Sequence, residues 1–303
     1  MTTVIEVNSL RKTYGATVAV EDISLTVSKG EIFGIVGPNG AGKTTAVESI
    51  MGLRKPDGGT VRVLGLDPQS EADSLRQRLG IQLQEASLPD YLKVWEALDL
   101  FATFYKQTIP WEPLLEQWGL ADKRNTRFKN LSGGQKQRLF IALALLNDPE
   151  VVFLDELTTG LDPQARRATW EMVRAIRDQG KTVILVTHFM DEAEELADRV
   201  AIIDEGKLVA LDTPQALIEG LQAGSSVRFS GVNGFDAAML RDVGGVTAVT
   251  RQDRHVIVHG NGPLLSRVAV ALSQYNITPT DLHVEQANLE DVFLALTGHK
   301  IRE

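Results

Sequence analysis

A glycine-rich segment near the start of the chain has the residue types that bind phosphate groups. It fits the pattern G-x-x-x-x-G-K-[ST] and comprises Gly37, Pro38, Asn39, Gly40, Ala41, Gly42, Lys43, Thr44 and Thr45. Glycines let backbone N–H groups approach oxygen atoms closely, and Lys43 supplies a positive charge for the β- and γ-phosphates. The Thr44 hydroxyl suits Mg²⁺, which prefers oxygen ligands. The segment predicts a site for a nucleoside triphosphate.

The sequence around this segment supports that interpretation. Residues 31–36 are mostly apolar and follow a turn at residues 28–30, which predicts a short buried strand. Residues 44–51 predict a helix, so bound phosphates would lie at a helix N-terminus. The alternative is a glycine-rich turn without a ligand, but strand, loop and helix occur in the order that the pattern requires.

Two acidic residues follow a second apolar run, Val151–Leu154. Asp155 is placed to hold Mg²⁺ directly or through water, and Glu156 to polarise the water that attacks the γ-phosphate. The transition state of phosphoryl transfer is loose, so positioning and charge neutralisation matter more than a strong base. Strands often end in acids at a protein surface, and this pair is informative because it follows a phosphate loop.

A second glycine loop, Leu131–Gln135, precedes a predicted helix over residues 136–146. Ser132, Gly133 and Gly134 would give the helix N-terminus accessible N–H groups and a hydroxyl, which suit a γ-phosphate. The same geometry also makes Ser132 an ordinary N-cap. Because the loop has no evident use in its own chain, it predicts that the working unit contains a second copy of the protein.

Composition limits the functions that the chain can have. Its 303 residues allow two domains, and 43% hydrophobic and 23% charged residues are typical of a globular protein. The absence of cysteine excludes disulfides and thiolate chemistry. The net charge of −9 argues against nucleic acid as a partner. Four clustered basic residues favour a solvated loop over a binding patch: Lys123, Arg124, Arg127 and Lys129.

The sequence predicts a soluble protein. We find no secretory leader at the N-terminus, and the longest apolar run, Leu139–Leu146, is far short of the ~20 residues that span a bilayer. A function at a membrane would therefore require a membrane-bound partner.

The order of predicted elements indicates an α/β architecture over residues 1 to about 220. We expect strands at residues 4–7, 32–36, 151–154, 182–187 and 199–203. Residues 91–120 predict helices instead, with an apolar stripe that we interpret as core packing, a partner groove being the alternative. The stripe consists of Leu92, Trp95, Leu98, Leu100, Phe101, Phe104 and Tyr105.

A turn-rich segment at residues 220–226 predicts a domain boundary. Beyond it we expect strands at 227–230, 246–251, 254–259 and 279–285, with helices at 235–242, 262–274 and 288–296. The first six elements have the β-α-β-β-α-β order of a ferredoxin-like domain. His255, His259 and His283 are too scattered in sequence to predict a metal site.

The phosphate loop, the pair Asp155 and Glu156, and the second glycine loop together resemble the motifs of the ATP-binding cassette (ABC) transporter ATPases. The resemblance covers residues 1 to about 220. Leu131–Gln135 is identical to the family signature, LSGGQ. Taken singly, Tyr14, Gln84 and His188 would favour packing or surface roles. The resemblance assigns an adenine-stacking role to Tyr14, a Mg²⁺-reaching and signalling role to Gln84, a coupling role between subunits to Asp162, and γ-phosphate contact to His188.

The resemblance implies a P-loop NTPase cassette with a RecA-like core, an antiparallel β subdomain and a helical subdomain over about 88–148. It implies an ATP-binding domain at 1–220 and a small α+β domain at 221–303. ATP and Mg²⁺ are the implied cofactors, with Lys43, Glu156 and His188 as catalytic residues and Thr44, Gln84 and Asp155 near the metal. Leu157 and Leu143 depart from the commonest family residues, a proline and an arginine.

The ending Leu289–Gly298 resembles that of ATPases of bacterial ABC-2-type exporters, including the daunorubicin-resistance type. The implied function is ATP hydrolysis in a head-to-tail dimer, with an identical chain as the favoured second subunit, which drives export through a separate ABC-2-type permease. The implied location is the cytoplasmic face of the membrane, through that permease, with coupling at residues 86–96. An importer ATPase and a non-transport ABC ATPase remain as alternatives.

Overall fold

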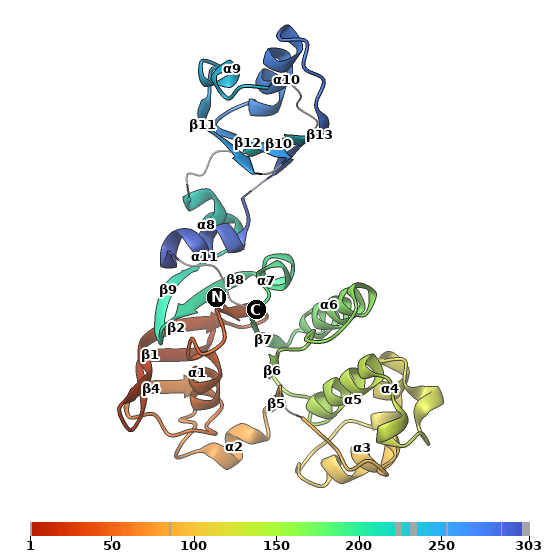
Figure 1. The fold of residues 1–303 in the computed structure, drawn as a ribbon. Helices are drawn as coiled ribbons and strands as arrows, with labels where there is room; N and C mark the ends of the chain where they lie inside the picture. Colours follow the sequence, from red (N-terminus) through yellow and green to blue (C-terminus); the bar gives the residue numbers. More distant parts are fainter. Residues whose placement is uncertain are drawn as a thin grey trace. The chain divides into compact units, whose positions relative to one another are not determined.

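The computed structural model describes residues 2–84, 86–221, 226–230, 235–252, 254–285 and 287–298. The chain forms two compact units, one ending at Pro214 and the other beginning at Gln215 (Figure 1). The boundary expected at residues 220–226 falls in a segment of which residues 222–225 lie outside the described part.

The first unit is built on a nine-stranded sheet with the order β4-β1-β2-β9-β8-β3-β7-β6-β5. Its strands are β1 Thr3–Tyr14, β2 Thr17–Ser28, β3 Ile32–Val36, β4 Gly58–Val63, β5 Leu79–Gln82, β6 Val151–Asp155, β7 Thr182–Thr187, β8 Arg199–Asp204 and β9 Lys207–Asp212. The helices are α1 Lys43–Ile50, α2 Ala72–Arg76, α3 Val94–Ala102, α4 Trp111–Gln117, α5 Gly133–Leu145, α6 Pro163–Asp178 and α7 Met190–Leu196. Helix α8, Pro214–Gly220, begins at the boundary, and all of it except its first residue belongs to the second unit.

Strands β8, β3, β7, β6 and β5 are neighbours in that order and run parallel to one another. All residues of β3, β6 and β7 are buried, as expected of strands covered on both faces. Because ligands bind beyond the carboxyl ends of such strands, the loops after β3, β7, β6 and β5 meet at one edge. These are the loops that carry Gly37–Thr45, His188, Asp155 with Glu156, and Gln84.

In the remaining part of this sheet, β1 pairs antiparallel with both β2 and β4, and β8 pairs antiparallel with β9, while β2 and β9 meet in a short parallel contact. The sequence pattern predicted a strand only at residues 4–7 of β1 and did not predict β2. Each of these strands has 12 residues, exposes many polar side chains and contains register shifts, so neither has the uniform apolar run of β3. The strands end in a tight turn beside Tyr14.

Helices α3, α4 and α5 pack together as the helical subdomain, with the 3₁₀ turns Ala121–Lys123 and Phe128–Asn130 between α4 and α5 (Figure 1). The apolar stripe predicted for this region is core only in part. Leu98 is fully buried, but Leu100 is 46% exposed and Phe104 is 63% exposed. The prediction of core packing is wrong for these two residues, because Leu100 lies on the exposed face of α3 and Phe104 lies in the turn beyond the end of α3 at Ala102.

The second unit contains β10 Ser226–Ser230, α9 Ala238–Arg241, β11 Val246–Gln252, β12 His255–Gly260, α10 Leu264–Gln274, β13 Thr280–Glu285 and α11 Leu289–Thr297. Its sheet has the order β11-β12-β10-β13 and is antiparallel throughout. This order confirms the ferredoxin-like prediction. Apolar residues of α9, α10 and the strands form its core, and α11 begins with a capping box between Asn288 and Asp291.

The predicted α/β cassette and the predicted small α+β domain are therefore both confirmed. Leu143 and Leu157, which depart from the family pattern, are both almost fully buried. In the part of the chain that the structure describes, no helix is long and apolar enough to cross a membrane, and no group of three or more acidic, histidine or cysteine side chains forms a metal site.

The packing of β5 on α5 gives a direct test of this fold. A Cβ atom at Gly80 would lie 2.1 Å from the Ala144 backbone oxygen, so Gly80→Ala should lower the free energy of unfolding by about 2 to 4 kcal/mol. Gly58→Ala is the matched control, because its Cβ would meet only the Arg11 Cβ at 3.5 Å. Urea denaturation measures both, and equal losses of stability would contradict this packing.

Candidate functional site

The phosphate loop joins β3 to α1 and has the backbone that its glycines allow. Gly37 and Gly42 have φ angles of 153° and 97°, which side chains disfavour. A Cβ at Gly37 would lie 2.0 Å from the Ile203 oxygen, and one at Gly42 would lie 2.3 Å from the Ala19 oxygen. Glycine is therefore required at both positions by conformation and by space. The exposed Thr44 hydroxyl follows in the first turn of α1.

Lys43 is 5% exposed and folds back over its own loop. Its Nζ donates hydrogen bonds to the backbone oxygens of Gly37, at 2.8 Å, and Pro38, at 3.0 Å. Burial lowers its pKa, while the charges of Glu156 and Asp155 oppose that shift. Carbonyl oxygens thus hold the ammonium group at the place where the sequence predicts phosphate oxygens, which are stronger acceptors.

Asp155 ends β6 and is 6% exposed. Burial raises the pKa of its carboxyl group to about 6, and the neighbouring Glu156 charge adds to the shift. Lys43 and a backbone N–H of Gln84 oppose it. A buried carboxylate that ionises with difficulty, close to one ammonium group, has the chemistry of a site that is completed by a divalent cation.

Glu156, Gln84 and His188 come from three separate loops and meet directly. Gln84 Nε2 donates to Glu156 Oε2 at 2.7 Å, and His188 Nδ1 lies 3.1 Å from Glu156 Oε1. The Glu156 side chain is 8% exposed and its φ is 50°, an uncommon angle for a residue with a side chain. The structure thus brings together three predicted site residues: Gln84, to which the resemblance assigns signalling, Glu156, predicted to polarise the attacking water, and His188, to which the resemblance assigns contact with the γ-phosphate.

The Leu131–Gln135 loop begins α5 and is a capping box. Ser132 Oγ accepts from the Gln135 N–H at 3.3 Å, and Gln135 Oε1 accepts from the Ser132 N–H at 3.0 Å. A Cβ atom added at Gly133 or Gly134 would have no heavy atom within 4 Å in the described part of the chain, apart from its own helix backbone and its chain neighbours. Nothing in the described part of the chain therefore requires glycine at these two positions, and the N-cap interpretation accounts for Ser132 and Gln135 only.

Tyr14 is 43% exposed at the end of β1. Two cations lie near its ring, Lys12 Nζ at 5.5 Å and the Arg54 guanidinium carbon at 5.6 Å from the ring centroid. Asp57, which sequence reasoning missed, fixes this turn by accepting from the Thr13 N–H at 2.7 Å and from Lys12 at 3.0 Å. These bonds lower the pKa of Asp57 to about 2. An exposed, oriented ring is available for stacking.

Asp162 is the N-cap of α6 and accepts from the Ala165 N–H at 2.8 Å. Sequence reasoning also missed a buried carboxyl group on α7. Glu192 is fully buried, its Oε1 accepts from Trp170 Nε1 at 3.1 Å, and burial raises its pKa. Since Trp170 lies on α6 and Glu192 on α7, this bond joins the helix that Asp162 begins to the helix that follows His188.

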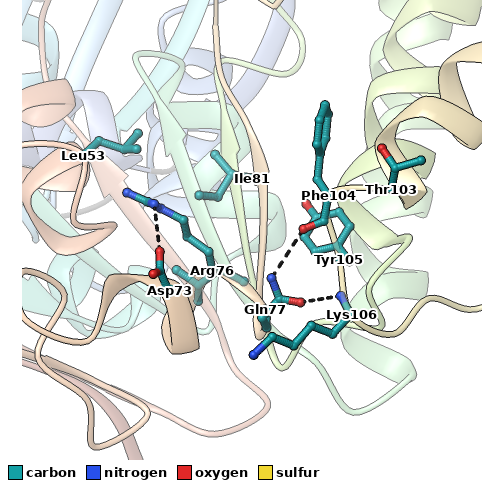
Figure 2. Close-up of a pocket in the computed structure, with 10 residues that line it drawn as sticks. Leu53, Asp73, Arg76, Gln77, Ile81, Thr103, Phe104, Tyr105 and Lys106 are labelled. Carbon is teal, nitrogen blue, oxygen red and sulfur yellow. Dashed lines mark hydrogen bonds and ion pairs between the residues drawn. The ribbon is translucent and has the colours of Figure 1, made fainter.

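A groove of about 630 Å³ lies at the edge of the sheet. It is lined by residues of β5, which is the edge strand, and by the segment that follows α3 in the helical subdomain. Figure 2 shows its lining: Leu53, Arg76 and Ile81 on one side, and Phe104 and Tyr105 on the other. Gln77 bridges the two sides, because its Oε1 accepts from the Lys106 N–H at 2.8 Å. The groove is apolar with a charged rim, and the exposed Phe104 ring lines it.

The family of the chain follows from its similarity to known proteins. The family model described as ABC transporter matches residues 20–159. The chain is 39% identical to a Nod factor export ATP-binding protein I of Burkholderia lata, over 99% of this chain and 98% of that protein. It is 38% identical to the daunorubicin/doxorubicin resistance ATP-binding protein DrrA of Streptomyces peucetius, over 98% of this chain and 93% of that protein.

Solved structures with similar folds include an ATP-binding subunit of an ABC transporter, with a TM-score of 0.66 and 28% identity over 72% of this chain and 93% of that one. A dimeric ATP-binding cassette in a post-hydrolysis state, bound to ADP and Pi, has a TM-score of 0.61 and 27% identity over 69% of this chain and 98% of that one. Cassettes of this family work as dimers with a membrane permease. The chain therefore belongs to the ABC transporter ATP-binding proteins and is the ATP-hydrolysing subunit of a transporter.

Proposed function

We propose that this ATPase powers export through a separate ABC-2-type permease at the cytoplasmic face of the membrane. The observation that supports this most directly is the full-length similarity to two proteins named for export or drug resistance, which includes the C-terminal unit. The intact set of catalytic residues supports an active motor. An importer would also use this set, and the permease decides between the two directions.

The residues of the site define how ATP would be held. Tyr14 stacks on adenine, the N–H groups of Gly37–Thr45 and the Lys43 ammonium bind the phosphates, and Thr44, Asp155 and Gln84 hold Mg²⁺. The metal would neutralise phosphate charge. Its presence would also favour the ionised form of Asp155, whose pKa burial raises.

Glu156 polarises the attacking water, and His188 contacts the γ-phosphate. Without a nucleotide, these two side chains and Gln84 satisfy one another at 3.1 and 2.7 Å. Each of them must exchange that partner for a ligand atom, so we infer that nucleotide binding is sensed jointly by the three loops that follow β5, β6 and β7.

The open space beside Gly133 and Gly134 would be occupied by the nucleotide bound to the partner chain. In a head-to-tail dimer, Leu131–Gln135 of one chain would approach the γ-phosphate held by Gly37–Thr45 of the other, with Asp162 beside the same interface. Two glycines with no demand from their own chain are expected where another molecule approaches the backbone.

The groove beside β5 is the proposed docking site for a cytoplasmic loop of the permease. Leu79 and Ile81 line it, and the same strand ends at Gln82, two residues before Gln84. A loop seated on Phe104 and Leu53 would therefore act on Gln84 through one short strand. The segment at residues 86–96, predicted from sequence as the coupling segment, continues the chain from Gln84 toward α3.

Glu156→Gln tests the catalytic assignment. It should slow ATP turnover about a hundredfold or more, because the amide cannot accept the proton of the attacking water, while ATP affinity is kept. Size-exclusion chromatography with ATP should show a stable dimer. Normal hydrolysis by this variant would contradict the role of Glu156.

Mixing two inactive variants tests the composite site. Lys43→Ala removes phosphate binding in one chain and Gly134→Asp blocks the second loop in the other, so each homodimer should be inactive. If the loop acts on the partner's ATP, a mixed dimer keeps one intact site, and an equal mixture should recover up to about a quarter of the wild-type rate. The absence of recovery would mean that both loops serve the same chain.

Phe104→Asp tests the groove. The isolated variant should hydrolyse ATP at the wild-type rate, because Phe104 is exposed and belongs to none of the loops that carry the catalytic residues. The variant should no longer co-purify with the permease. Val270→Asp is the matched control, an equally non-conservative change at a residue that is 59% exposed in the second unit. Co-purification of Phe104→Asp at the level of Val270→Asp would show that the permease docks elsewhere.

A further inference from the structure

His188 packs against an aromatic neighbour that the nucleotide-binding roles leave unused. The Phe189 ring centroid lies 4.0 Å from that of His188, with 40° between the ring planes. The Arg166 guanidinium carbon lies 4.5 Å from the same Phe189 centroid. Phe189 therefore contacts both the imidazole and the guanidinium group, and we call this contiguous set of three groups the stack.

Arg166 is held in this stack from two directions. Its Nη1 donates to Asp191 Oδ2 at 3.1 Å, and Asp191 lies in the first turn of α7 directly after Phe189. Its Nε is buried and, within the described residues, has no hydrogen-bond partner. Leaving that donor unpaired is unfavourable, so the contact with the ring and the ion pair with Asp191 must outweigh this cost.

Arg166 also belongs to the first turn of α6. Its backbone N–H donates to the Asp162 oxygen at 2.9 Å, and Asp162 caps the same helix. A displacement of the start of α6 would therefore move the guanidinium group, and with it the stack. The other end of the stack is fixed by His188 Nδ1, 3.1 Å from Glu156 Oε1.

We propose that Phe189 and Arg166 are positioning residues for His188, which tie the orientation of its ring to the start of α6. This inference rests on the proposed function, in which His188 contacts the γ-phosphate and Asp162 lies at the dimer interface. The stack would transmit a shift of the partner cassette at Asp162 to the imidazole without touching ATP. A simple packing role for Phe189 would require neither the guanidinium group nor its ion pair.

The first test observes His188 directly. The chain has only five histidines, so their imidazole signals can be followed individually by NMR. Phe189→Leu and Arg166→Met should both shift the His188 signal, because the first removes the ring 4.0 Å from the imidazole and the second removes the cation that contacts that ring. Arg167→Met is the matched control, since Arg167 is exposed and adjacent on the same helix, and it should leave that signal in place.

The second test separates positioning from general packing. Phe189→Leu and Arg166→Met should lower kcat about tenfold while KM for ATP and the melting temperature stay near wild type, because a misplaced group costs rate more than binding. In a His188→Ala background, Phe189→Leu should cause no further loss of the residual rate.

An unchanged His188 signal, or an equal additional loss in the His188→Ala background, would overturn the inference. If His188→Ala itself kept the full rate, the proposed role of His188 would be wrong and this inference would fall with it. A slow His188→Ala variant beside a fully active Phe189→Leu variant would overturn the inference alone and leave the proposed function standing.

Discussion

The first unit depends on three charged groups that are buried side by side: Lys43, Asp155 and Glu156. Burial lowers the pKa of Lys43 and raises that of Asp155 from 3.8 to about 6, so both groups resist ionisation. The folded protein binds the Asp155 proton more tightly than the unfolded chain does. The free energy of unfolding therefore falls as the pH rises from 3.8 to about 6. At neutral pH the loss is at most about 3 kcal/mol, because water partly hydrates the group. The site is unfavourable for the empty protein and is suited to phosphates and a divalent cation.

The parallel sheet determines where this cluster lies. Strands β3, β7, β6 and β5 are neighbours, and each contributes one loop at the same edge. The order of the strands thus decides which loops can touch. Strand β7, which precedes His188, lies between β3, which precedes the phosphate loop, and β6, which ends at Asp155. The interior of these strands is fully apolar, so the polar groups have no place except beyond the strand ends.

The sequence allowed much of this to be predicted, for identifiable reasons. The strands at residues 32–36 and 182–187 match β3 and β7 because each is a short run buried on both faces. Strand β2 could not be predicted, since half of its residues face solvent and its pairing with β1 is irregular. Asp57, Arg166 and Phe189 were also missed. Their contacts join residues that lie 44 positions apart for Asp57 and Thr13 and 25 apart for Arg166 and Asp191, and no local pattern encodes these contacts.

The two glycine loops differ in what their own chain demands of them. At Gly37 and Gly42, both the backbone angle and the space exclude a side chain, so folding alone would preserve these residues. At Gly133 and Gly134 there is open space in a helical turn, where alanine would favour the helix. Glycine at the second pair is thus a cost to the monomer. A cost of this kind is retained where function requires close access to the backbone, and for these two residues the molecule that gains access must lie outside their own chain.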